Sequence, residues 1–346
     1  MTVGGDLSIT YSAPGRCGIV GNPSDMYGGA VISCSTGERA TVTVEEYDRL
    51  EIVVEENVRT IRSPDELSQD GGMFDAVLAA IEYFELDKAK LRISVTTAIP
   101  VRAGLSGSTA VMIALAAGLL EWMERTEFEH YQTSALWKSA RKNRYMLAET
   151  VRHIELYFLK IVCGYQDAYM CTFGSLNFLD FHDKEKYLTL EREPLGTVEN
   201  LAGVAPEVPL VLALTGVQRV SGVVHKPVRD RWIDGDPLIV RGVLRLAHIA
   251  RMSKGAIISG DWDRLGEAMT ENHEIVRSFG SSSEVNERII RTALDSGAIA
   301  AKLAGAGKGG TIIALNPEPA GMIEALKDAG VATILYPAPT DGVRRE

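Results

Sequence analysis

The chain has 346 residues, of which 46% are hydrophobic and 24% charged, and its formal net charge is −10. This length allows two domains, and the composition is that of a globular enzyme rather than a fibrous or disordered chain. The acidic balance argues against nucleic acid as the main partner, because affinity for a phosphate backbone needs a basic face. The longest apolar run, residues 110–120, is too short to span a bilayer, and the first residues do not resemble a secretion signal. We therefore predict a cytoplasmic protein with no membrane partner.

A strand is predicted at residues 8–13, followed by Pro14-Gly15-Arg16 and a polar turn over 21–29. Arg16 is a fixed cation suited to phosphate, and Asp25 in the turn is an acceptor suited to sugar hydroxyls. Asn, Pro, Ser and Asp are also the ordinary turn residues, so a plain turn remains the alternative for this segment.

The next segments predict structure without suggesting chemistry. β-rich runs at 31–35, 40–46 and 50–54 indicate an antiparallel meander. Apolar residues recur at helical spacing over 73–84, which predicts a helix with one buried face.

A glycine- and serine-rich loop over residues 100–110 lies between a β-branched run and a long apolar helix former. The start of a helix leaves backbone N–H groups unpaired and carries partial positive charge, and glycines let the backbone approach an anion. Ser106, Ser108 and Thr109 add hydroxyl groups. The loop therefore predicts a phosphate site, the alternative being serines that only cap a buried helix.

Two carboxylates follow. A long helix is predicted over 133–159, and most of its charges should form a solvated face. Glu155 is the exception, because it precedes Asp167 by 12 residues and both could reach the glycine- and serine-rich loop if their helix packs beside it. One carboxylate on Mg²⁺ and a second beside the attacking hydroxyl are the minimal set for phosphoryl transfer.

A polar stretch over 191–206 places a domain boundary between residues 195 and 196. Beyond it, with extra helices set aside, the order is β-α-β-β-α-β, a ferredoxin-like unit. Gly305–Gly310 lies between its middle strands and matches G-x-G-x-x-G, but a strand rather than a helix follows, which argues against a dinucleotide site. A glycine-rich hairpin without a ligand remains the alternative.

The segments 14–25, 100–110 and 303–310, in this order, resemble the three signature motifs of the GHMP kinases. The resemblance implies an α+β fold with an N-terminal domain (1–195) like ribosomal protein S5 domain 2 and a ferredoxin-like C-terminal domain (196–346), using ATP and Mg²⁺. It implies Mg²⁺ ligation by Ser108 and Glu155, catalysis by Asp167, and Arg16 near the transferred phosphate. The implied ATP-binding residues are Gly104, Leu105, Ser106, Gly107, Ser108 and Thr109 in the first loop and Gly305, Ala306, Gly307 and Gly309 in the second. Lys308 departs from the pattern, since many relatives have a small residue there.

Two branches of this superfamily compete. The turn with Asn22 and Asp25, the segment 221–232 and Asn272-His273 resemble glucuronokinase, whereas Gly164-Tyr165-Gln166-Asp167 is similar to heptose 7-phosphate kinases. We predict a sugar 1-kinase of the glucuronokinase type, a monomer or homodimer, that acts on a small sugar acid. The predicted substrate-binding residues are Asn22, Asp25, Asp167, Arg229 and Arg231. A non-catalytic sugar sensor and a decarboxylase-like lyase are the other hypotheses.

Overall fold

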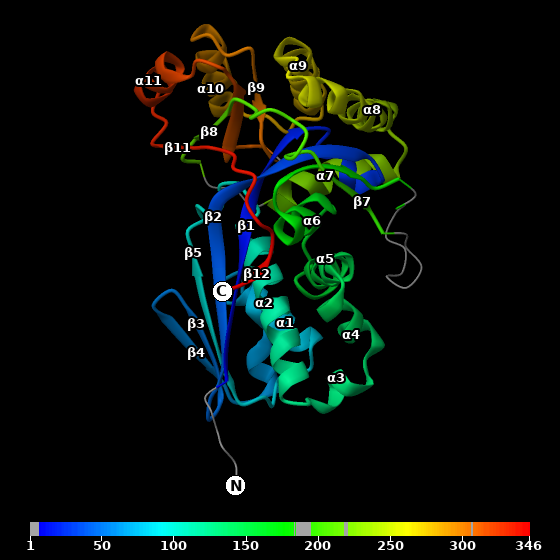
Figure 1. Ribbon diagram of the computed structural model, residues 1–346, viewed down its shortest axis with the longest axis vertical. Helices are drawn as coiled ribbons and strands as arrows, with labels where there is room; N and C mark the ends of the chain where they lie inside the picture. Colours follow the sequence, from blue (N-terminus) through cyan, green and yellow to red (C-terminus); the bar gives the residue numbers. More distant parts are fainter. Residues whose placement is uncertain (1–6, 183, 185–194, 218–220, 306) are drawn as a thin grey trace.

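The computed structural model describes residues 7–182, 184, 195–217, 221–305 and 307–346, with the backbone alone for 221–225. It contains two bodies, each built on its own sheet (Figure 1). In Figure 1 the second body sits on one end of the long strands of the first. The α+β, two-domain fold predicted from the sequence is confirmed.

The first sheet has eight strands, in the order β12-β1-β2-β5-β3-β4, with β6 on β2 and β7 on β6. Their bounds are β1 Ser8–Val20, β2 Ala30–Glu46, β3 Leu50–Val54, β4 Asn57–Ile61, β5 Leu91–Thr97, β6 Leu176–Asp180, β7 Thr197–Asn200 and β12 Arg344–Arg345. β2 is long enough to serve two neighbours, since residues 40–46 pair with β5 and residues 30–34 pair with β6.

The predicted meander is wrong in its topology. β2 is a single strand where two were expected, and β5 lies between β2 and β3. β3 runs parallel to β5. Local patterning shows which residues are extended, but the insertion of β5 depends on a chain segment that comes only after α1 (Asp75–Tyr83).

Helices pack along one side of this sheet (Figure 1). They are α1, α2 Gly107–Arg125, α3 Glu129–Thr133, α4 Ala135–Lys142, α5 Arg144–His153, a π-turn at Ile154–Phe158 and α6 Gln166–Phe173, and two 3₁₀ turns lie at Ser24–Tyr27 and Pro64–Leu67. The single helix predicted over 133–159 is broken at Ser134 and Asn143. Both residues have extended backbones and cap the next helix, with their side chains accepting from Trp137 N (3.1 Å) and Tyr145 N (2.9 Å).

The second body is built on a four-stranded antiparallel sheet. Its strand order, β11-β8-β10-β9, confirms the ferredoxin-like prediction. The strands are β8 Leu210–Leu214, β9 Ala300–Leu303, β10 Thr311–Leu315 and β11 Thr333–Leu335. The helices are α7 Ser221–Ile233, α8 Pro237–Ser259, α9 Trp262–Ser278, α10 Glu284–Asp295 and α11 Ala320–Asp328.

Two segments cross the predicted division at 195/196. β7 pairs with β6, and β12 returns from the end of the chain to pair with β1, so both belong to the first sheet. A strand that completes the edge of a distant sheet carries no mark of this in its own composition. The largest buried cluster also contains side chains of both bodies, among them Ile19, Ile257 and Ile313, so the two bodies share an apolar core. Within the described residues, no helix is long and apolar enough to cross a membrane.

Candidate active site

A short part of β1 lies between the two glycine-rich loops. The amide of Arg16 donates to Leu105 O (3.0 Å), and the amide of Gly18 donates to Ala304 O (2.9 Å). The loops also meet directly, because Thr311 Oγ1 donates to Ala103 O (2.8 Å). The three sequence segments singled out above therefore lie together, at the junction of the two bodies.

The first loop ends in the start of α2. Within the described chain, the amides of Gly107, Ser108 and Thr109 have no hydrogen-bond partner, as expected for the first turn of a helix. Ser106 stands before the helix in a left-handed conformation (φ 61°), and its hydroxyl is buried without a partner among the described residues. The Ser108 side chain is exposed. These open donors at the positive end of a helix form a site suited to phosphate.

Arg16 joins Asp167 to this loop. Its guanidinium contacts Asp167 Oδ1 through Nε (2.7 Å) and Nη2 (2.5 Å), and its Nη1 donates to Gly104 O (2.8 Å). Arg16 is buried, whereas the Asp167 side chain is 32% exposed. The resemblance implied a separate role for each of these two residues, and the structure places them in contact, with part of the carboxylate open to a ligand.

Asp25 supports the loop that leads to Asp167. Its Oδ2 accepts from the amides of Tyr165 (2.9 Å) and Gln166 (3.0 Å). Burial raises the pKa of Asp25, and these two amides oppose the shift. A Cβ at Gly164 would overlap the same carboxylate oxygen, so only glycine fits there. One oxygen of this predicted substrate-binding residue therefore has a structural partner.

Glu155 reaches the first loop through Thr109 rather than Ser108. Thr109 Oγ1 donates to Glu155 Oε1 (2.6 Å), and Ser108 is the residue directly before Thr109 on the helix. Burial raises the pKa of Glu155 to about 7, with Asp167 adding to the shift and the Thr109 hydrogen bond opposing it. A buried carboxyl beside a second carboxylate is a place where a cation would be stabilised.

The donor set fits Mg²⁺. Among the described residues, no cluster of three or more His, Cys, Asp or Glu could hold a metal ion by itself. Mg²⁺ is commonly held by one or two protein oxygens together with substrate phosphates and water. Ser108 and Glu155 would supply such a pair, since Glu155 is joined to Thr109, the residue directly after Ser108.

The two arginines predicted to bind substrate have acidic neighbours. Arg231 contacts Asp236 through Nε (2.8 Å) and Nη2 (2.7 Å), which already uses its planar fork. Arg229 makes one longer contact with Asp230 (3.3 Å), and its Nε is buried without a hydrogen-bond partner in the described part of the chain. Their helix, α7, packs on the turn that contains Asp25 through Trp232 and Tyr27, whose ring centroids are 4.6 Å apart. Arg229 is thus the better candidate of the two.

Two other cations, both against the ring of Tyr165, were not predicted as site residues. Arg152, expected on a solvated face, is buried with its guanidinium 3.7 Å from the ring centroid of Tyr165. Lys184 Nζ lies 4.5 Å from the same ring and 2.9 Å from Glu149. Arg152 is a charge at a buried position of α5, which the spacing of the sequence did not reveal, and Lys184 lies outside any helix or strand, where no periodic pattern could have indicated it.

The second glycine-rich loop is closed by its neighbours. The amides of Lys308, Gly309 and Gly310 donate to Ser281 O (2.7 Å), Asn286 Oδ1 (2.8 Å) and Val217 O (3.0 Å). Gly305 and Gly307, predicted to bind ATP with Gly309, lie in the same loop, and Ala306 lies outside the described residues. This loop therefore contributes shape to the junction more than free amide donors.

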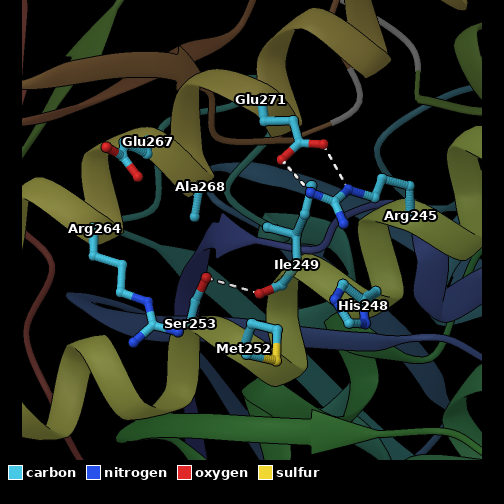
Figure 2. Close-up of a pocket in the computed structure, with 9 residues that line it drawn as sticks. All are labelled: Arg245, His248, Ile249, Met252, Ser253, Arg264, Glu267, Ala268 and Glu271. Carbon is cyan, nitrogen blue, oxygen red and sulfur yellow. Dashed lines mark hydrogen bonds and ion pairs between the residues drawn. The ribbon is translucent and has the colours of Figure 1, made fainter.

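A separate pocket of about 150 Å³ lies between α8 and α9 (Figure 2). Arg245 and Glu271 close one side of it with two hydrogen bonds of 2.6 and 2.9 Å. None of the predicted site residues lines it. It has no part in the site at the domain junction.

Comparison with known families identifies the fold's relatives. The model of the GHMP kinase N-terminal domain matches residues 73–175, and that of the GHMP kinase C-terminal domain matches residues 253–332. The chain belongs to the GHMP kinase superfamily. This GHMP kinase is 29% identical to glucuronokinase 1 of Arabidopsis thaliana, over 94% of its own length and 91% of the relative's. A heptose 7-phosphate kinase of Campylobacter jejuni is 26% identical over 61% of this chain and 57% of its own.

The solved structures agree on the fold. Lactococcus lactis galactokinase, in complex with galactose, superimposes with a TM-score of 0.72, covering 98% of this chain and 95% of that one at 15% identity. This likeness concerns the fold alone. The family match makes the protein an ATP-dependent small-molecule kinase with an alcohol group as acceptor.

Proposed function

We propose that this GHMP kinase transfers the γ-phosphoryl group of ATP to the anomeric hydroxyl of a sugar acid. D-Glucuronate is the first candidate for this acceptor. The observation that carries the proposal is the Arg16–Asp167 pair, held 2.5–2.7 Å apart beside the open start of α2. A non-catalytic sensor would need the nucleotide site but not this pair.

Asp167 is the group that receives the proton. Its partly open carboxylate accepts the hydrogen of the sugar hydroxyl, the hydroxyl oxygen bonds to the γ-phosphorus, and the bond from that phosphorus to the β-bridging oxygen breaks to release ADP. Arg16 fixes the orientation of the carboxylate and adds positive charge beside the phosphate loop. The free amides and Ser106 at the start of α2 bind the phosphates.

Mg²⁺ would be held by Ser108 and Glu155 together with phosphate oxygens. The ion would neutralise charge on the phosphates. Thr109 orients the Glu155 carboxylate from the adjacent helix position. The glycine loop after β9 shapes the opposite side of the nucleotide site.

Two observations favour a sugar acid. The relative with 29% identity over almost the full chain is a glucuronokinase, and Arg229 has an unused buried donor on α7, the helix whose Trp232 contacts Tyr27 of the turn that holds Asp25. A substrate carboxylate in a protein of net charge −10 needs such a local cation. The likeness to a heptose 7-phosphate kinase covers less of the chain and makes that sugar phosphate the second candidate.

An ADP-release assay over a panel of sugars, sugar acids and heptose 7-phosphate tests the proposal, with the phosphate position of the product assigned by NMR. We expect glucuronate to be phosphorylated at its anomeric oxygen in clear preference to glucose and galactose. A preference for heptose 7-phosphate would move the protein to the other branch, and equal use of neutral hexoses would reject recognition of the acid.

Arg229→Gln tests the carboxylate contact itself. Loss of a charge-assisted hydrogen bond is worth about 1.5–3 kcal/mol, so the preference for glucuronate over glucose should shrink about ten- to a hundredfold. Arg231→Gln is the matched control, because Asp236 already occupies that guanidinium. The reverse ranking of the two variants would assign the carboxylate to Arg231.

A further inference from the structure

A fully buried lysine links the two bodies at the candidate site. Lys302 lies on β9 of the second body and is 1% exposed. Its Nζ donates to Asn22 Oδ1 (2.9 Å) and Gly18 O (3.3 Å) of the first body, and to Leu303 O (2.6 Å) beside it. An ammonium group has three protons, and these are three acceptors. The group is thus fully hydrogen-bonded, although no carboxylate among the described residues pairs with it.

Such a lysine is unusual, because a buried charge is costly unless its partners compensate it. The ionisable groups that act on it are Arg16 and Cys17 on β1, and Lys302 in turn lowers the pKa of His273 on α9. Burial lowers the pKa of Lys302 to about 7, Cys17 opposes this shift, and Arg16 adds to it. An apolar side chain at this position would stabilise β9 without the cost of burying a charge. We therefore expect the amine of Lys302 to have a role outside the strand.

The acceptors of Lys302 lie on the turn that leads to Asp25. Asn22 is held a second time from the same body, since Asn272 donates through Nδ2 to Asn22 O (3.3 Å) and accepts from Gly21 N (2.6 Å). A Cβ on Gly18 would come within 2.8 Å of Asn22 Oδ1, so glycine makes room for this side chain. Lys302 and Asn272 together fix the turn relative to the second body.

We propose that Lys302 is a positioning residue for acceptor binding, which acts by holding the Asn22 side chain and the turn before Asp25 against the second body. The amide oxygen of Asn22 accepts a hydrogen bond from Lys302. The amide nitrogen of the same side chain is therefore the atom that can donate to a sugar oxygen. From Asp25 the constraint continues to the amides of Tyr165 and Gln166, and so to Asp167 at the start of α6. The start of α2 receives no hydrogen bond from Lys302.

This arrangement predicts a split between the two substrates. Lys302→Met keeps the length of the side chain and removes the charge and all three hydrogen bonds. We expect the KM of the acceptor to rise roughly tenfold or more, while the KM of ATP and the Mg²⁺ requirement stay within about twofold of the wild type. Lys302→Arg keeps the charge and several donors and should recover part of the loss. Lys327→Met, an exposed lysine on α11 of the same body, is the matched control.

The inference rests on one part of the proposed function, namely that the enzyme phosphorylates an acceptor sugar, and it does not depend on which sugar this is. The acceptor used is glucuronate or, if the wild type does not phosphorylate it, the sugar of the panel with the highest wild-type rate, so failure of the glucuronate proposal is seen separately. Folding of each variant is measured by circular dichroism and thermal unfolding. An unchanged acceptor KM in folded Lys302→Met, or equal increases in the KM of both substrates, overturns the proposal. If neither Lys302→Met, Lys302→Gln nor Lys302→Arg folds, Lys302 serves stability alone and the proposal also fails.

Discussion

The two glycine-rich loops meet at the domain junction but use their backbones differently. In the loop before α2, the amides of Gly107, Ser108 and Thr109 have no partner in the described chain. In the loop between β9 and β10, the amides of Lys308, Gly309 and Gly310 all donate to atoms of the second body. The first loop offers hydrogen-bond donors to a ligand, whereas the second has already used those of Lys308, Gly309 and Gly310.

The glycines of the second loop are explained by close approach. A Cβ on Gly307 would overlap the carbonyl oxygen of Ser281, and one on Gly309 would lie 2.8 Å from Val217 O. Both have positive φ, at 95° and 115°. Glycine-rich sequence is therefore compatible with two different physical roles. Changes beside the first loop should alter turnover without altering folding, and changes in the second should do the opposite.

The largest effect is expected at Asp167, beside the first loop. Asp167→Asn removes the proton acceptor and keeps the size of the side chain, so kcat should fall about 10²- to 10⁴-fold while ATP binding and thermal stability are kept. The measurement is steady-state ADP release together with nucleotide titration. Asp180→Asn is the control, because it removes another Asp–Arg pair, the one with Arg251 at 2.9 Å. Wild-type turnover in Asp167→Asn would make this residue structural.

The second loop should respond through stability. Gly307→Ala combines a left-handed backbone with an overlap at Ser281 O, and we expect the free energy of unfolding to fall by about 2–4 kcal/mol. Gly297→Ala is a close control, since Gly297 has φ 92° but no atom within 4 Å of a new Cβ, and it should cost about 1 kcal/mol. Urea unfolding of the two variants measures the difference. If both lose the same amount, close approach does not explain the glycine at 307.

A smaller effect, of about tenfold, is expected for the metal requirement. Ser108→Ala or Glu155→Gln should raise the Mg²⁺ concentration for half-maximal activity about tenfold or more, with the fold intact. Ser259→Ala serves as the control, because that hydroxyl only bonds its own helix, at Gly255 O (2.9 Å). Unchanged Mg²⁺ dependence in both site variants would reject them as ligands and leave the first loop with phosphate contacts alone.

Much of this junction was predictable from short-range sequence patterns. A Gly/Ser loop before an apolar run predicts the start of α2, and a glycine cluster followed by a β-branched run predicts the hairpin of the second body. The ferredoxin-like order is also confirmed, because each strand and helix has its own periodicity. The resemblance of the ordered motifs to GHMP kinases is confirmed by the family match.

The unpredicted features depend on contacts between distant segments. β5 inserts beside β2, and β12 returns to β1, through pairing that neither partner encodes alone. The helix breaks at Ser134 and Asn143 had a local signal, since both are good N-cap residues, but the mixed charge of the segment masked it. Lys302 could have been noticed as a single charge in an otherwise apolar strand, although its partners Gly18 and Asn22 are 284 and 280 residues away.

The pH dependence of stability tests the protonation state of Lys302, the buried lysine that joins the two bodies. In the unfolded chain a lysine keeps its proton to about pH 10, whereas burial lowers the pKa of Lys302 to about 7 in the folded protein. Between these values the unfolded chain binds one more proton than the folded one, so raising the pH favours folding, by at most about 1.4 kcal/mol per pH unit. Below pH 7 both states are protonated and the contribution is constant.

Lys302→Met removes this group, so the free energy of unfolding of the wild type relative to the variant should increase from pH 7 to pH 9. Urea unfolding of both proteins at matched pH values measures this difference, in which the titration of His273 and of other shared groups largely cancels. A difference that stays flat would show that Asn22, Gly18 and Leu303 hold the ammonium in its charged form up to the ordinary lysine range. The junction would then rest on a permanent buried cation, whereas an increase with pH would mean that the second body releases a proton and one of the three hydrogen bonds at neutral pH.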